Sequence, residues 1–124
     1  MEQNTARIPQ YPNTAPMKGT SIRISEKQRS NIDRIVKATN AQSIGASVRL
    51  LITAEITAVD SGQRKPADYI PTNEPKLYTI GLKLSDAGIE DLTKLSSFYN
   101  APSISDTVCH LLNQVITELE KVGD

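Results

Sequence analysis

Cys109 and His110 are the adjacent pair of side chains in this sequence that is best suited to covalent or metal chemistry. They are also its only cysteine and its only histidine, so neither an intrachain disulfide nor a structural zinc site is expected. Neighbouring helix positions point in different directions, which favours two ordinary helix residues over a nucleophile and its base. Paired carboxylates on a shared motif, a phosphate loop and a catalytic triad are all missing from the sequence. The chain is therefore predicted not to be an enzyme and to need no cofactor, metal or small-molecule substrate.

Charge is divided unevenly along the chain, although 14 basic and 14 acidic residues give a formal net charge of zero. Residues 18–59 contain seven basic and three acidic side chains, a local charge of +4. Residues 76–124 contain four basic and seven acidic ones, a local charge of −3. Attraction to phosphate depends on local rather than total charge, so the first half is the better candidate to face a nucleic acid.

The sequence overlays on itself without a gap when it is shifted by 60 residues. Conservative pairs such as Arg23/Lys83 and Ile24/Leu84 accompany the identities. The identical pairs include Ser25/Ser85, Asn40/Asn100, Ser43/Ser103, Val48/Val108, Leu51/Leu111 and Ile56/Ile116. Because the spacing of strand, cap, turn and second cap recurs together, we infer an internal duplication.

Each half opens with a short alternation of polar and apolar residues, in residues 20–24 and 79–84. A period of two predicts a half-buried strand. The apolar faces comprise Ile22 and Ile24 in the first half, and Ile80, Leu82 and Leu84 in the second. The polar faces comprise Ser21 and Arg23 in the first half, and Thr79, Gly81 and Lys83 in the second.

Two helices are predicted to follow each strand. Ser25 and Ser85 start the first of these helices, and Ser25 forms a capping box with Gln28. The second helices begin at Ser43 and Ser103, after an asparagine that tolerates the left-handed conformation. Apolar residues at helical spacing then predict core stripes, namely Ile44, Val48, Leu51, Ile52 and Ile56, and Ile104, Val108, Leu111, Leu112, Val115, Ile116 and Leu119.

The remaining segments are predicted to connect or extend these units. Residues 1–18 contain three prolines and no signal-peptide core, and are expected to form a disordered arm. Residues 60–75, rich in proline and polar residues, are expected to be a linker on which Tyr69 and Ile70 pack against the surface. No stretch approaches the ~20 apolar residues of a membrane span, so a cytoplasmic protein without a membrane partner is expected.

The predicted fold is therefore mostly α with a short two-stranded antiparallel ribbon, in the order β-α-α-linker-β-α-α. Its domains are a basic copy at 19–59 and an acidic copy at 76–124. This pattern resembles the ribbon-helix-helix (Arc/MetJ-type) superfamily over residues 18–59 and 76–122. The tandem arrangement resembles that of TraY-like proteins of conjugative plasmids. The resemblance implies sequence-specific binding of double-stranded DNA, with the ribbon in the major groove.

The resemblance also assigns roles to particular residues. It implies that the outward strand residues read base edges, namely Ser21, Arg23, Thr79, Gly81 and Lys83. Phosphate contacts are expected at the start of the second helices and on the first helix, from Ser43, Ile44, Gly45, Ser47, Lys27, Arg29 and Ser103. Gly81 departs from the pattern because it has no side chain to read with, and Asp106 would repel a phosphate at the second of these helix ends.

Several alternatives stay open at this point. The two copies pair either within one chain, which suits a non-palindromic half-site and which we favour, or between two chains. The expected role is a small transcriptional regulator or an accessory protein in plasmid or phage DNA transactions, located at the nucleoid when DNA is bound. The alternative is a protein-interaction module (an antitoxin, adaptor or assembly factor) that self-associates or binds a partner through its acidic second copy.

Overall fold

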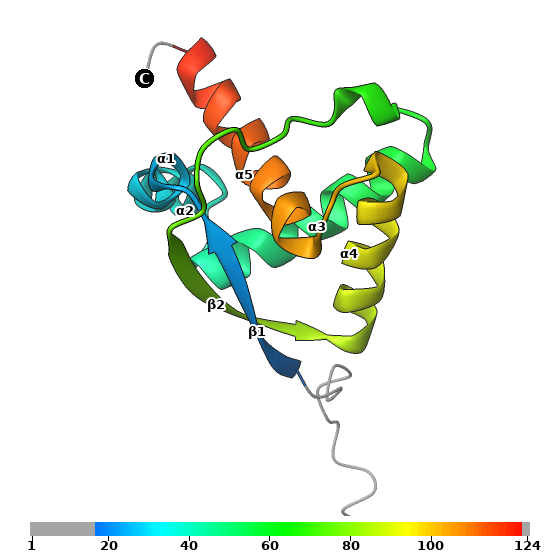
Figure 1. Cartoon of the computed structure of the whole chain (residues 1–124), viewed down its shortest axis with the longest axis horizontal. Helices are drawn as coiled ribbons and strands as arrows, with labels where there is room; N and C mark the ends of the chain where they lie inside the picture. The colour runs from blue at the N-terminus through cyan, green and yellow to red at the C-terminus, as the bar shows by residue number, and fades with distance from the viewer. Residues whose placement is uncertain (1–16, 123–124) are drawn as a thin grey trace, which may run out of the picture.

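The computed structural model describes residues 17–122, and its elements follow the order strand, three helices, strand, two helices (Figure 1). Residues 1–16, most of the expected arm, lie outside the described part, whereas Met17 and Lys18 already belong to the first strand. The elements are β1 (Met17–Ile24), α1 (Glu26–Ser30), α2 (Ile32–Ala38), α3 (Ile44–Asp60), the 3-10 helix η2 (Pro66–Asp68), β2 (Tyr78–Ser85), α4 (Asp86–Tyr99) and α5 (Ile104–Lys121).

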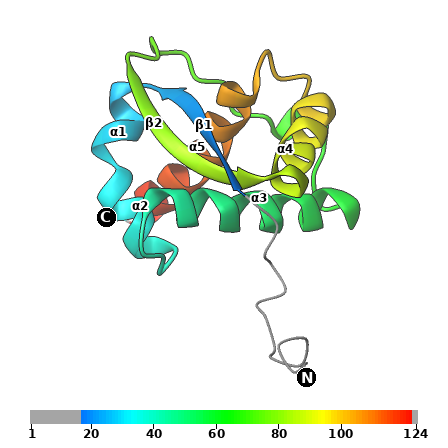
Figure 2. The ribbon, with the colours of Figure 1, turned by 90° about the horizontal axis from the view of Figure 1, so that it is seen from below.

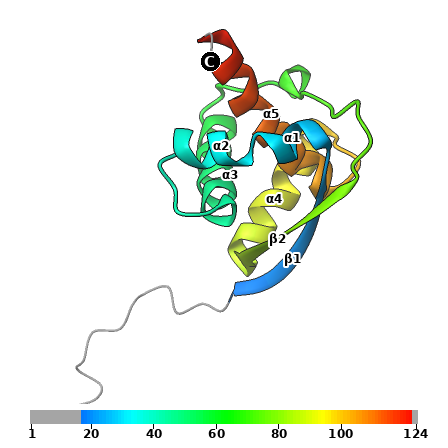
Figure 3. The same ribbon diagram turned by 90° about the vertical axis from the view of Figure 1, so that its left-hand side faces the viewer.

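Strands β1 and β2 pair antiparallel within the chain and form a two-stranded ribbon across one side of the molecule (Figure 2). In its register Ser21 lies opposite Gly81 and Arg23 opposite Thr79. Alternate side chains of both strands point into the helices, and Figure 3 shows the ribbon curving along their edge. The buried strand residues are Ile22, Ile24, Leu82 and Leu84. The alternation read from the sequence therefore places one face in the core and leaves the other to solvent.

Helices α3, α4 and α5 pack behind the ribbon and supply most of the core. The helix residues buried there are Ile35, Val48, Ile52, Leu92, Leu95, Tyr99, Val108, Cys109, Leu111, Leu112 and Ile116. Each long helix starts at a serine whose side chain accepts a backbone N–H: Ser43 from Ala46, Ser85 from Gly88 and Ser103 from Asp106. The capping box of Ser25 and Gln28 is also present.

The predicted fold class, a tandem of two β-α-α copies, is wrong. The described residues form a single ribbon with five α-helices, three after β1 and two after β2. The extra helix arises because the expected first helix breaks at Asn31 (φ −102°, ψ 4°). There the Asn31 side-chain amide donates to the Lys27 carbonyl at 2.7 Å, and the Asn31 N–H bonds to Gln28 instead. A side chain that takes the carbonyl of the preceding turn competes with the helical backbone.

The segment between the two halves is an ordered strap rather than a plain linker. It contains η2, and the Tyr69 ring stacks on Tyr99 with ring centroids 6.0 Å apart. Further along, Ile70 N–H donates to His110 Nδ1 at 2.9 Å. Tyr69 and Ile70, the two residues expected to pack against the surface, make these contacts, and the aromatic packing and hydrogen bonding order the segment.

Asn40 and Asn100 both end helices in the left-handed conformation, with φ of 55° and 54°. We expect Asn100→Ala to lower the free energy of unfolding by about 1 kcal/mol, because alanine is strained at positive φ, whereas Asn100→Gly should be close to neutral. Urea denaturation followed by circular dichroism measures both. Equal stability of the alanine and glycine variants would contradict the assignment of this conformation.

Candidate nucleic-acid interface

The five predicted base-reading positions, Ser21, Arg23, Thr79, Gly81 and Lys83, lie together on the outward face of the ribbon. All five are exposed. Neither strand contains an acidic residue, so this face carries two positive charges and no negative ones. The structure thus brings together residues that are up to 62 positions apart in the sequence. The face offers cationic and hydroxyl donors on a surface about two strands wide.

Arg23 is held in place from both its backbone and its side chain. Its N–H donates to Ser105 Oγ at 3.2 Å, and its carbonyl accepts the Cys109 thiol at 3.4 Å. Its guanidinium donates from Nη2 to the carbonyl of Lys76 at 2.7 Å. A guanidinium has five N–H donors, so this single bond orients the group while leaving donors for a ligand.

The opposite strand is supported by a different helix. Arg49 of α3 donates from Nη1 to the carbonyl of Lys83 at 3.1 Å. Helix α3 thus contacts β2, whereas α5 contacts β1. Each strand therefore contacts the last helix of the opposite half of the sequence, α5 for β1 and α3 for β2. This exchange places Arg23, from the basic half, beside α5 of the acidic half, and Lys83, from the acidic half, beside Arg49 on α3 of the basic half.

The first turn of α3 contains most of the predicted phosphate contacts. Ser43 is exposed and caps the helix, and Ile44 and Gly45 are half-buried beside it. Ser47 is fully buried, and its hydroxyl is hydrogen bonded to Thr39 Oγ1 at 2.8 Å. The expected phosphate contact of Ser47 is therefore wrong, because its hydroxyl belongs to the core between α2 and α3.

The first turn of α5 is already paired with a basic side chain, that of Lys76. Asp106 forms an ion pair with Lys76 and accepts a hydrogen bond from Ser103 Oγ at 2.6 Å. Burial alone would raise the pKa of Asp106, but the bonds from Lys76 and Ser103 lower it below its ordinary value. The carboxylate thus stays charged, and Ser103 is engaged by it rather than offered to a phosphate.

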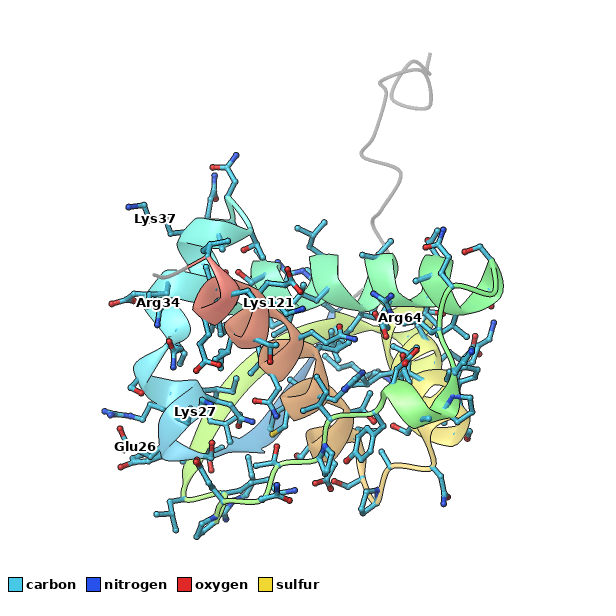
Figure 4. All side chains as sticks on the ribbon, turned by 90° about the horizontal axis from the view of Figure 1, so that it is seen from above. Glu26, Lys27, Arg34, Lys37, Arg64 and Lys121 are labelled. Carbon is cyan, nitrogen blue, oxygen red and sulfur yellow. The ribbon has the colours of Figure 1, made fainter. Side chains whose placement is uncertain are left out.

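Lys27 and Arg29, the predicted phosphate contacts on α1, point in different directions. Lys27 forms an ion pair with Glu120 near the end of α5 at 3.4 Å, on the side away from the ribbon (Figure 4). The Arg29 guanidinium instead lies 4.6 Å from the ring centroid of Tyr78, at the start of β2. Of the two, Arg29 is the one adjacent to the ribbon.

A buried polar cluster behind the ribbon was not predicted from the sequence. Glu55 of α3 is 3% exposed and accepts hydrogen bonds from the Tyr99 hydroxyl and from Gln114 Nε2 at 3.3 Å. Arg64 Nε lies 3.2 Å from both carboxylate oxygens. One feature of the sequence could have indicated the buried carboxylate: Glu55 lies at helical spacing between Ile52 and Val59, on an otherwise apolar stripe.

His110 completes the cluster. Its Nδ1 accepts the Ile70 N–H, so a neutral imidazole carries its proton on Nε2, which lies 3.7 Å from Glu55 Oε2. Burial alone would raise the pKa of Glu55, but hydrogen bonds from His110, Tyr99 and Arg64, together with the Arg64 charge, lower it to about 2. Burial and the bond to Glu55 raise the pKa of Tyr99 in turn. Glu55 is therefore an ionised anchor between α3, α4, α5 and the strap.

Comparisons with models of protein families, with curated proteins and with solved structures found no match to this chain. Within residues 17–122, no cluster of three or more histidine, cysteine, aspartate or glutamate side chains is arranged to hold a metal ion. In the same range, no helix has the length and apolar character needed to cross a membrane.

Proposed function

We propose that this protein binds double-stranded DNA in a sequence-specific manner, with the outward face of the β1–β2 ribbon in the major groove. A two-stranded antiparallel ribbon has the width to enter that groove, where each base pair presents a distinct pattern of donors and acceptors. The ribbon's exposed face has two cations, two hydroxyls and no carboxylate. The role that follows is that of a small regulator of transcription or an accessory factor in plasmid or phage DNA transactions.

The position and fixed orientation of the Arg23 side chain are the main support for this proposal. It is exposed on the groove-facing side, yet its guanidinium is oriented by the carbonyl of Lys76 at 2.7 Å. An arginine oriented in this way is suited to donate two hydrogen bonds to O6 and N7 of guanine. Lys83 supplies a less directional donor, and the first turn of α3, with Ser43 as its cap, supplies backbone N–H groups for a phosphate.

Titration of labelled duplexes by fluorescence anisotropy tests the proposal. A random pool and a pool enriched by selection on the full chain are compared at about 50 and 200 mM salt, where phosphate contacts differ in strength. We expect tighter binding of the enriched pool and a loss of affinity at the higher salt. Equal and negligible binding of both pools at the lower salt would overturn DNA binding and favour the protein-interaction module instead.

Replacing Arg23 by alanine should weaken binding to the selected site by about 1–3 kcal/mol and relax specificity at one base pair. Arg23→Lys should recover part of the affinity without the bidentate selectivity. Lys121→Ala is the control, because Lys121 lies on the side opposite the ribbon (Figure 4). Anisotropy on the selected duplex and on its point variants gives both quantities. An Arg23→Ala protein with unchanged affinity would remove Arg23 from the interface.

A further inference from the structure

The outward face of the ribbon has no two-fold symmetry, although its backbone does. The register pairs Ser21 with Gly81, and a local two-fold axis through that pair relates Arg23 to Lys83 and Gly19 to Thr79. At each of these three related positions the two strands carry different residues. Because both strands belong to one chain, no second copy is needed to complete the ribbon, and none restores the symmetry of its face.

The surroundings of the two ends differ as well. The Arg23 end lies beside the Lys76–Asp106 ion pair and Ser105 on α5. The Lys83 end lies beside Arg49 on α3, and nearby Lys18 forms an ion pair with Asp86 at 3.2 Å. Each end thus has a lysine–aspartate ion pair, but one end presents an oriented arginine, whereas the other presents a lysine whose carbonyl is held by a second arginine, Arg49.

We propose that one ribbon recognises a non-palindromic DNA site and binds it in a single orientation, with the half under Arg23 read through a guanine. Palindromy of a DNA site mirrors two-fold symmetry in the protein that reads it. A palindrome presents the same base edges twice, and this face cannot make the same contacts twice. The inference rests on the proposed function, because it concerns the shape of the DNA target.

A symmetrised ribbon provides the sharpest test. The combined variant Gly19→Thr, Gly81→Ser, Lys83→Arg gives both strands the same outward triplet of threonine, serine and arginine. A Cβ atom added at Gly19 or Gly81 meets no atom within 4 Å, and neither glycine has a positive φ, so the added side chains fit. The single variant Lys83→Arg is the matched control, and circular dichroism with thermal melting checks that each variant is folded.

Selection from a random duplex pool first defines the wild-type site as two halves, A under Arg23 and B under Lys83. Binding is then measured to three duplexes: A–B, and the palindromes A–A and B–B. The wild type should prefer A–B and bind B–B at least about tenfold more weakly, the size of one lost bidentate contact. The symmetrised variant should reverse this order and prefer A–A to A–B.

A palindromic selected site, or a wild-type protein that binds A–A as tightly as A–B, would overturn the inference while leaving DNA binding intact. A symmetrised variant that is folded but keeps the preference for A–B would overturn it too, because the asymmetry would then not lie in these residues. Failure of the wild type to enrich any duplex would instead overturn the proposed function, and the inference with it. The two failures are thus distinguishable in one set of measurements.

Discussion

Glu55→Ala is expected to lower the free energy of unfolding by about 3–5 kcal/mol, the cost of removing one partner from a buried ionic network. The variant would leave the buried Tyr99 hydroxyl without its acceptor and would remove the carboxylate that lies 3.7 Å from His110 Nε2. It would also release Arg64, which ties the strap to α3. Urea denaturation at pH 7, followed by circular dichroism, measures the loss.

Asp60→Ala is the matched control for this variant. Asp60 is a carboxylate at the end of the same helix and also pairs with a cation, Lys94, at 2.8 Å, but both groups are more than half exposed. Exposed pairs contribute little, so stability should hardly change. Glu55→Gln should fall between the two, since it keeps the shape and one acceptor. A Glu55→Ala protein as stable as Asp60→Ala would show that the cluster contributes nothing to folding.

Acid should destabilise the protein through Glu55 between about pH 4.5 and pH 2. The pKa of Glu55 falls from 4.5 to about 2 on folding, so the unfolded chain takes up a proton in this range while the folded chain does not. The contribution of Glu55 is thus fully present above pH 4.5 and is lost as the pH falls toward 2. Its size is about 3 kcal/mol by linkage.

Comparison with Glu55→Gln isolates this contribution from that of the other carboxylates. Unfolding free energies of both proteins are measured from urea titrations at several pH values between 7 and 2. Other groups with lowered pKa, such as Asp106, titrate in both proteins and cancel in the difference. The stability advantage of the wild type should shrink steadily below pH 4.5. An advantage that stays constant down to pH 2 would contradict the ionised state of Glu55.

Local structure was largely predictable from the sequence because its causes are local. Alternation of side chains predicted both strands, and serines followed by helical spacing predicted the starts of α1, α3, α4 and α5. The break at Asn31 was not predicted, since asparagine is tolerated within helices and only its bond to the Lys27 carbonyl makes the difference. Because of that break, the described residues form one ribbon with five α-helices, where the sequence analysis predicted two copies with two helices each.

The candidate interface was predictable in its residues but not in its surroundings. Period-two alternation identified the outward positions, which the structure places on one face. The charge of each half suggested that the first half would hold most of the DNA. That expectation stays a prediction. The sequence did not show that Arg23 lies beside α5 and Lys83 beside α3, because antiparallel pairing carries each strand across to the helix of the other half.

The sequence by itself determined where strands and helices begin and which face of each is apolar, since these depend on residues within a few positions of one another. The tertiary structure alone decided which charges become neighbours. It buried Glu55 against Tyr99 and His110, turned the expected linker into an ordered strap, and anchored Arg23 on the Lys76 carbonyl. These contacts join residues more than 30 positions apart, and their geometry follows from packing rather than from any local pattern.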